Sequence, residues 1–298
     1  MRIASHSVSN TIVRQIQHLA SQQARLQNQV GTGQRIFEPE DDPSAVSRVL
    51  NLESERRQLV QFNRNSNRAL EIVQASFSGL KGLKDVSDRS GEIATLGSGG
   101  TSRNALRAYA SEVNQLLEQS LQLANSRLGN DYLFAGTAVA TAPLVAVRNA
   151  AGQIESVSYV GNDESAPIPL SATTVVSPGT SGVTNAAIGD FINQLVALRD
   201  ALAGGNTAAV PAVQSGLLAA EDVLVEALGE NGGIQTRIEA SRSQQDDLAL
   251  SLESLISKET DADLPSTVVK LTQAQTAYQA ALQSAATIMR LSLLDYIR

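Results

Sequence analysis

The sequence contains no cysteine and no tryptophan, and aromatic residues make up only 3% of its 298 residues. The missing cysteines exclude a disulfide framework and thiol chemistry. A compact enzyme core usually buries several aromatic side chains, whereas Ala, Ser, Gln and Leu dominate here. This composition is typical of long helices, so we expect an elongated molecule.

The familiar catalytic motifs are also missing. The sequence has no Gly-x-Ser-x-Gly elbow, phosphate-binding loop, dinucleotide fingerprint or His-Glu-x-x-His helix. Its only histidines, His6 and His18, lie twelve residues apart on one predicted helix, which is too far along the axis to share a metal. We therefore predict that the chain is not an enzyme, has no catalytic residues and binds no cofactor or metal.

Long hydrophobic runs are absent as well. No apolar stretch approaches the roughly 18 residues of a membrane span, and the N-terminus lacks the apolar region and cleavage site of a secretory signal. The acid-free start, which carries Arg and Ser, also resembles a mitochondrial transit peptide. A similar heptad pattern occurs at the other end of the chain. This match favours an N-terminal helix that is not cleaved off and that pairs with the C-terminal helix.

Charge is unevenly distributed along the chain. The formal net charge is −7, but residues 1–37 contain four arginines and no acid, and residues 264–298 have a net charge of +2, so the middle carries −13. Net acidity argues against a nucleic-acid partner. The scattered N-terminal arginines fit solvated positions or ion pairs between subunits better than a polyanion site.

Both ends of the chain carry a heptad pattern in which apolar residues recur at steps of four and three. Such a stripe, which we call a seam, is marginal in an isolated helix and requires a partner. We predict that the terminal helices pair with each other and with neighbouring copies, which is typical of an assembly subunit. The predicted seam residues are Ile12, Ile16, Leu19, Leu26, Val30, Leu264, Val268, Leu271, Tyr278, Leu282, Ala285 and Met289, with Gln23 and Gln275 as polar exceptions.

The first predicted helix, 8–30, ends at Gly31-Thr32-Gly33, and an acidic segment follows. Asp42 and Pro43 fit a helix start, with Asp as N-cap and Pro at the first helical position. The alternative is that the four acidic residues of this segment bind a cation. Those residues are Glu38, Glu40, Asp41 and Asp42.

The middle of the chain changes pattern twice. Helical periodicity predicts helices over 44–96 and 103–128, joined by a Gly-rich turn. Prolines and short β-prone runs at 144–147, 157–160 and 173–176 then predict a small β domain over 131–187. Helical pattern resumes over 188–202 and is broken by Gly204-Gly205-Asn206. Two more predicted helical stretches follow, 217–228 and 234–258, separated by residues 229–233.

These elements predict a mainly α fold: an elongated helical rod with paired N- and C-terminal coiled-coil helices and a small inserted β domain. The predicted domains are a terminal coiled-coil domain (1–42 with 263–298), a helical rod domain (43–130 with 188–262) and an outer β domain (131–187).

Several short segments resemble a known family. Thr32-Gly33-Gln34-Arg35-Ile36, followed by Asp41-Asp42-Pro43-Ser44-Ala45, is similar to the N-terminal motif of flagellins. Flagellins proper usually continue Asp-Asp-Ala-Ala-Gly, whereas Asp-Asp-Pro resembles the hook-associated proteins of the bacterial flagellum. The segments 123–137 and 291–297 resemble the same family, so the resemblance covers both ends but not the β domain.

The resemblance implies an inner tube layer made by the terminal helices and an extracellular subunit at the hook–filament junction. Such a subunit is exported without a cleaved signal, needs an export chaperone and forms a ring of copies. Its partners are the first hook-associated protein on the hook side and flagellin on the filament side, for which it acts as a template. Two rivals stay open: a short flagellin that forms the filament itself, and a secreted or signalling coiled-coil protein that does not polymerise.

Overall fold

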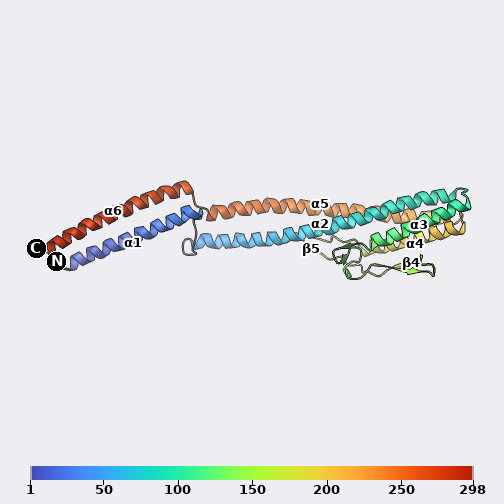
Figure 1. The fold of residues 1–298 in the computed structure, drawn as a ribbon, viewed down its shortest axis with the longest axis horizontal. Coiled ribbons are helices and arrows are strands. Elements are labelled where there is room, and N and C mark those ends of the chain that lie inside the picture. The colour runs from blue at the N-terminus through green and yellow to red at the C-terminus, as the bar shows by residue number, and fades with distance from the viewer. Residues whose placement is uncertain (1, 297–298) are drawn as a thin grey trace. The chain divides into compact units, whose positions relative to one another are not determined.

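The computed structural model describes the backbone of residues 2–296 and the side chains of residues 10–288 (Figure 1). This part of the chain is mainly α-helical, as the sequence predicts. Its helices are α1 (Arg2–Thr32), α2 (Pro43–Ser98), α3 (Arg103–Ala124), α4 (Gly182–Gly204), α5 (Val210–Thr260) and α6 (Leu264–Tyr296).

The chain divides into two compact units. Unit 1 comprises residues 1–58 and 248–298, and unit 2 comprises residues 59–247. Unit 1 contains the packed pair α1 and α6, and unit 2 contains α3, α4, the strands and the facing parts of α2 and α5. Neither boundary coincides with those predicted at residues 42 and 263, so the three-domain division stays a prediction.

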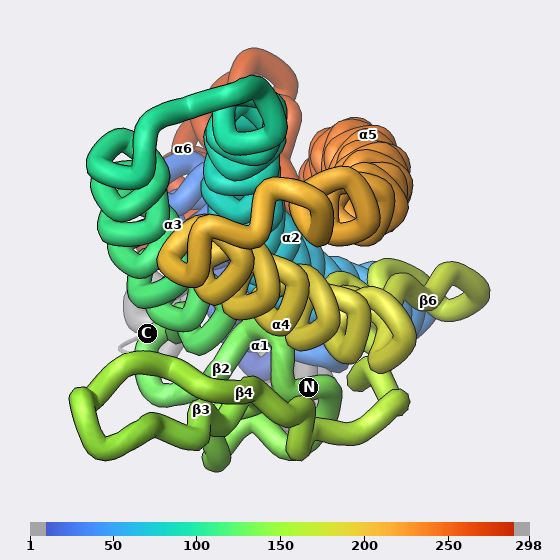
Figure 2. The backbone as a smooth tube through the Cα atoms, turned by 90° about the vertical axis from the view of Figure 1, so that its right-hand side faces the viewer, coloured from blue at the N-terminus to red at the C-terminus, as the bar shows by residue number. Residues whose placement is uncertain are grey.

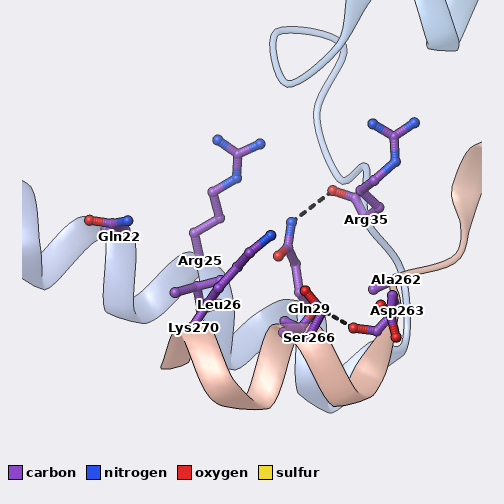
Figure 3. A pocket seen from close by; sticks show the side chains of 10 residues that line it. Gln22, Arg25, Leu26, Gln29, Arg35, Ala262, Asp263, Ser266 and Lys270 are labelled. Atoms are coloured by element: carbon purple, nitrogen blue, oxygen red, sulfur yellow. Dashed lines mark hydrogen bonds between the residues drawn. The ribbon is translucent and has the colours of Figure 1, made fainter. Parts of the chain in front are cut away.

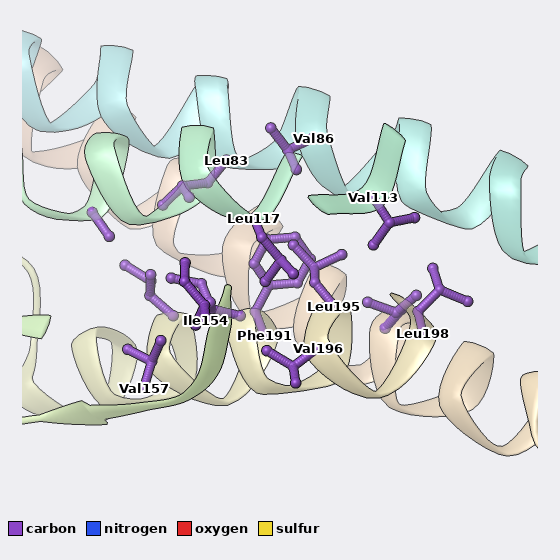
Figure 4. Close-up of a cluster of buried hydrophobic side chains, with 14 of the residues drawn as sticks. Leu83, Val86, Val113, Leu117, Ile154, Val157, Phe191, Leu195, Val196 and Leu198 are labelled. Carbon is purple, nitrogen blue, oxygen red and sulfur yellow. The ribbon is translucent and has the colours of Figure 1, made fainter. Parts of the chain in front are cut away.

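One hydrophobic core holds unit 2 together. Phe191, Leu195 and Leu198 of α4 are completely buried and point between α2 and α3 (Figure 4). In Figure 2, α4 lies between these two helices and the β3–β4 hairpin. Each fully buried Leu or Phe contributes roughly 1.5–3 kcal/mol, so this core fixes the arrangement of unit 2.

The strands form three separate antiparallel pairs. Their bounds are β1 (Arg127–Leu128) with β2 (Asp131–Tyr132), β3 (Leu144–Arg148) with β4 (Ile154–Tyr159), and β5 (Ile168–Pro169) with β6 (Val175–Val176). Within the predicted β segment, the β3–β4 hairpin packs on α4. Leu144, Ile154 and Val157 lie in the same buried cluster as Phe191, because one face of the β3–β4 hairpin is apolar and covers α4.

Two asparagines bind the outer edges of the β3–β4 hairpin. The amide of Asn193 on α4 accepts from Val157 N at 2.9 Å and donates to Val157 O at 2.9 Å. Asn125, the C-cap of α3, does the same for Leu144 N and O, at 3.1 and 2.9 Å. Each amide therefore replaces the neighbouring strand that a two-stranded sheet lacks.

The predicted third helix, 103–128, ends earlier, at Ala124. Asn125 leaves the helix because its side chain is committed to Leu144, and Gly129 supplies the positive φ of 65° for the β1–β2 turn. The sequence prediction missed this because the partner of Asn125 comes later in the chain.

The predicted break at residues 229–233 is wrong, because α5 runs without interruption from Val210 to Thr260. A heptad continues through the glycines, with Leu224, Asn231 and Ile238 all buried. Each glycine costs about 1 kcal/mol relative to Ala in a helix. Burial of the apolar heptad residues on either side outweighs that local cost.

In unit 2, α5 packs antiparallel to α2. Lys84 pairs with Glu221 at 3.3 Å, and Ser66 and Gln245 form a fully buried hydrogen bond of 3.0 Å. The Gln245 amide also donates to Leu170 O at 2.7 Å. One buried polar side chain thus joins α2, α5 and the β5–β6 hairpin, and sets their register.

Candidate assembly surface

The two terminal helices lie side by side in unit 1. They run antiparallel, because the end of α1 meets the start of α6 through an isolated β-bridge between Gln34 and Asp261. The predicted seam of α1 faces α6: Leu26 is 9% exposed, and the remaining predicted positions are half-buried. Those positions are Ile12, Ile16, Leu19 and Val30.

The face that α6 turns towards α1 differs from the predicted seam. Thr267, Ala274 and Ala285 are buried at 7% exposure each, and Leu271 and Tyr278 are half-buried. Three of these five positions, Leu271, Tyr278 and Ala285, belong to the predicted seam. The small side chains of the face allow the two backbones to approach closely.

The other predicted seam positions of α6 lie beside this contact and face outward. Leu264 is 45% exposed, Val268 is 46% exposed and Leu282 is 42% exposed. We call these three residues the exposed flank of α6. Met289, the last predicted seam residue, lies outside the side chains that the structure describes.

The chain enters and leaves the α1–α6 pair at what we call the crossover, which consists of residues 33–42 and 259–263. Gly33 has a φ of 73° and ends α1. Arg35 N then donates to Thr260 O at 2.6 Å, and Ala262 N donates to Gly33 O at 2.8 Å. The two chain segments are therefore joined by their backbones, independently of side-chain identity.

Ion pairs strengthen the crossover. Arg48 binds Glu259 through two parallel hydrogen bonds of 2.9 Å, and Arg35 donates to Glu259 O at 2.8 Å. The bidentate bond raises the pKa of Arg48 and lowers the pKa of Glu259. Sequence reasoning singled out neither Arg48 nor Glu259, because 211 residues separate them and no motif links them.

The acidic segment 38–42 is used within the crossover. Asp42 is the N-cap of α2: its carboxylate accepts from Ala45 N at 3.0 Å and from Ser44 Oγ at 2.8 Å. Asp41 accepts from Phe37 N at 3.0 Å and pairs with Arg25 at 3.0 Å. Among the residues that the structure describes, no cluster of three or more His, Cys, Asp or Glu is arranged to hold a metal ion.

The Ala45 amide, followed by Ser44 and Arg35, lowers the pKa of Asp42 from 3.8 to about 2. Backbone hydrogen bonds from Phe37 and Glu38 lower the pKa of Asp41 in the same way. Both carboxylates are therefore ionised under ordinary conditions, and they balance the arginines beside them.

None of the helices in the described region has the length and apolarity that a bilayer crossing demands.

Residues 3–139 match the bacterial flagellin N-terminal helical region. The first half of the chain is thus flagellin-like. Over nearly its whole length the chain is similar to flagellar hook-associated protein 3 of Escherichia coli (strain K12), with 26% identity over 320 residues that cover 98% of each chain. The resemblance to hook-associated proteins is confirmed.

Solved structures give the same fold. FlgL of Bacillus cereus matches with a TM-score of 0.60 and 16% identity, over 70% of this chain and 99% of that one. The flagellar junction protein FlgL of Legionella pneumophila matches with a TM-score of 0.54 and 12% identity, over 72% of this chain and all of that one. At these identities the similarity supports the fold.

Proposed function

We propose that this chain is a structural subunit of the bacterial flagellum at the hook–filament junction, where it adapts the hook to the filament. One observation carries the proposal: the match to flagellar hook-associated protein 3 of E. coli extends over 98% of both chains. A flagellin-type N-terminal region alone would suit a filament subunit equally well.

The role that we propose for this subunit is mechanical. The α1–α6 pair buries one apolar track and leaves the exposed flank of α6 uncovered. Copies arranged around a common axis bury this flank against their neighbours, at roughly 1.5–3 kcal/mol for each side chain that becomes fully buried. Lateral contacts of this type build the inner layer of a tube.

Partners and location follow from this role. The subunit is exported to the cell exterior without a cleaved signal and is held by an export chaperone before it leaves the cell. It forms a ring of copies that contacts the first hook-associated protein on one side and flagellin on the other, for which the ring is the template. The role requires neither nucleic acid nor membrane.

Immunogold labelling of intact flagella tests the proposal. We expect one band of label at the distal end of the hook. Label along the whole filament would identify the chain as a short flagellin, and label retained in the cytoplasm would identify a coiled-coil protein that does not polymerise. Either result would overturn the proposal.

A further inference from the structure

Unit 1 contains a pocket of about 340 Å³ between the end of α1 and the start of α6. Three cationic side chains line it, Arg25, Arg35 and Lys270, against a single carboxylate, Asp263. The close-up in Figure 3 shows the cationic groups of Arg25, Arg35 and Lys270 on the same side of the helix pair. Leu26, which is 9% exposed, supplies an apolar floor.

The pocket has positive charge available for a ligand. Arg25 pairs with Asp41 at 3.0 Å, and Arg35 pairs with Asp42 at 3.2 Å and with Glu259 at 3.9 Å, yet both side chains stay about half exposed, at 53% and 42%. Lys270 makes no ion pair with any side chain that the structure describes. The first turn of α6 adds the positive end of its dipole. The ligand chemistry that fits is a carboxylate beside an apolar group.

The same unit displays a segment of that chemistry. Phe37 is 40% exposed, and Glu38 and Glu40 on either side of Pro39 are also exposed. Neither glutamate forms an ion pair among the described side chains. The segment has a fixed shape, because Asp41 Oδ2 accepts from Phe37 N and Glu38 N at 3.0 and 3.2 Å, and Pro39 restricts the backbone.

We infer that residues 37–40 of one copy dock in this pocket of a neighbouring copy, with Glu38 and Glu40 facing Lys270 and Arg25. The inference rests on the proposed function, because it requires copies side by side. Loop and pocket both lie at the crossover, so a rotation about an axis along α1 and α6 brings one to the other without a shift along that axis. A contact between two different surfaces, repeated by rotation alone, closes into a ring when the rotations add up to a full turn.

Cysteine cross-linking tests the contact, since the chain has no cysteine of its own. The variant carries Glu40→Cys and Lys270→Cys in the full-length chain, and intact flagella are treated with a short bis-maleimide. We expect covalent dimers and larger species, roughly tenfold above a control with Glu40→Cys and Lys258→Cys, because Lys258 is exposed in unit 1 but does not line the pocket.

Asp41 already pairs with Arg25 of the pocket within one chain, so the informative outcome is a faster-migrating monomer without any covalent dimer. That result would show that the loop reaches only its own pocket and would overturn the inference. The inference would also be overturned if no cross-links formed in a chain that immunogold labelling places at the junction. Cross-links in a chain that labels the whole filament would leave the contact standing and overturn the proposed function instead.

Charge reversal gives a second readout if the cysteine variant does not assemble. Lys270→Glu is expected to lower the amount of subunit per flagellum roughly tenfold, and adding Glu38→Lys and Glu40→Lys to the same chain is expected to restore it. Failure of the combined variant to recover, while both variants are exported normally, would overturn the inference.

Discussion

Two buried serines of α2 differ in whether their hydroxyl groups are hydrogen-bonded. Ser66 is completely buried and exchanges hydrogen bonds with Gln245. Ser87 is 2% exposed, and its Oγ has no hydrogen-bond partner among the described residues. Both residues are serines on the same helix, so their different surroundings decide what each contributes to stability.

We predict that Ser66→Ala and Ser87→Ala have opposite effects. Removing the Ser66 hydroxyl leaves part of the buried Gln245 amide unsatisfied and should cost about 1–3 kcal/mol. Removing the unpaired Ser87 hydroxyl should be neutral or stabilise by up to about 1 kcal/mol. Urea unfolding followed by circular dichroism measures both, and equal effects would contradict the assigned contacts.

Asp42 makes the crossover sensitive to acid. Its pKa falls from 3.8 to about 2 in the folded chain, so its contribution to stability is complete above pH 4 and is lost as the pH falls towards 2. The difference in helix content between the native chain and Asp42→Ala should therefore shrink over that range. Circular dichroism at stepwise lower pH measures it.

Ser102, the N-cap of α3, provides the control for the acid prediction. Its hydroxyl accepts from Ala105 N at 3.3 Å and does not titrate. Ser102→Ala should cost about 0.5–2 kcal/mol at every pH. If the effects of both caps followed pH in the same way, the ionisation of Asp42 would not be the cause.

At the scale of elements, the hairpin β3–β4 is stable because helices cover what a two-stranded sheet lacks. Its apolar face is buried against α4, and Asn125 and Asn193 each bind one backbone position that has no strand partner, on opposite edges of the hairpin. An isolated hairpin of this length is marginal in water. Its stability depends on side chains from α3 and α4.

Replacing Asn193 by Leu should destabilise unit 2 by about 1–3 kcal/mol, because Val157 N and O lose their partners in a buried position. Val145→Ala is the matched control, since Val145 lies on the outer face of the same hairpin and is 47% exposed. That change should stay within about 0.5 kcal/mol. Equal losses in a urea titration would show that the Asn193 amide is not needed.

The continuity of α5 through residues 229–233 can be tested by replacing a glycine. A Cβ added at Gly232 meets no atom within 4 Å, so Gly232→Ala should stabilise the chain by about 0.5–1 kcal/mol. The same change at Gly79 of α2 places a Cβ 2.9 Å from the Phe134 ring and should destabilise. A loss of stability for Gly232→Ala would indicate a turn instead of a helix at residues 229–233.

At the scale of the whole molecule, the apolar residues of α6 are partly buried against α1 and partly exposed. Residues such as Ala274 pack on α1 inside one chain, whereas Leu264, Val268 and Leu282 stay exposed. We propose that the exposed residues are kept for contacts with neighbouring copies.

We predict that Leu282→Asp abolishes filament attachment while the monomer keeps its helix content, because a charge is tolerated at a position that is 42% exposed but not in a dry interface. Ala274→Asp should instead disrupt the α1–α6 pair itself, since that position is 7% exposed. Electron microscopy of flagella and circular dichroism of the monomer separate the two effects. Normal filaments on Leu282→Asp would refute the role of the flank.

Local patterns in the sequence were enough for the helical class, for the start of α6 at Leu264 and for the turn at Gly33. Periodicity, capping residues and glycines act over a few neighbouring residues, so they can be read without the fold. The predicted α1 seam positions are buried or half-buried, and their role in assembly stays a prediction.

Tertiary structure alone decided the rest. The heptad of α5 continued through three glycines because buried residues on both sides outweighed them, and α3 ended at Ala124 because Asn125 binds Leu144. In α6, the residues buried against α1 include Ala274 and Ala285, whose small side chains let α1 approach closely. These features depend on the free energies of contacts between segments that are distant in the sequence. A local sequence pattern does not contain that information.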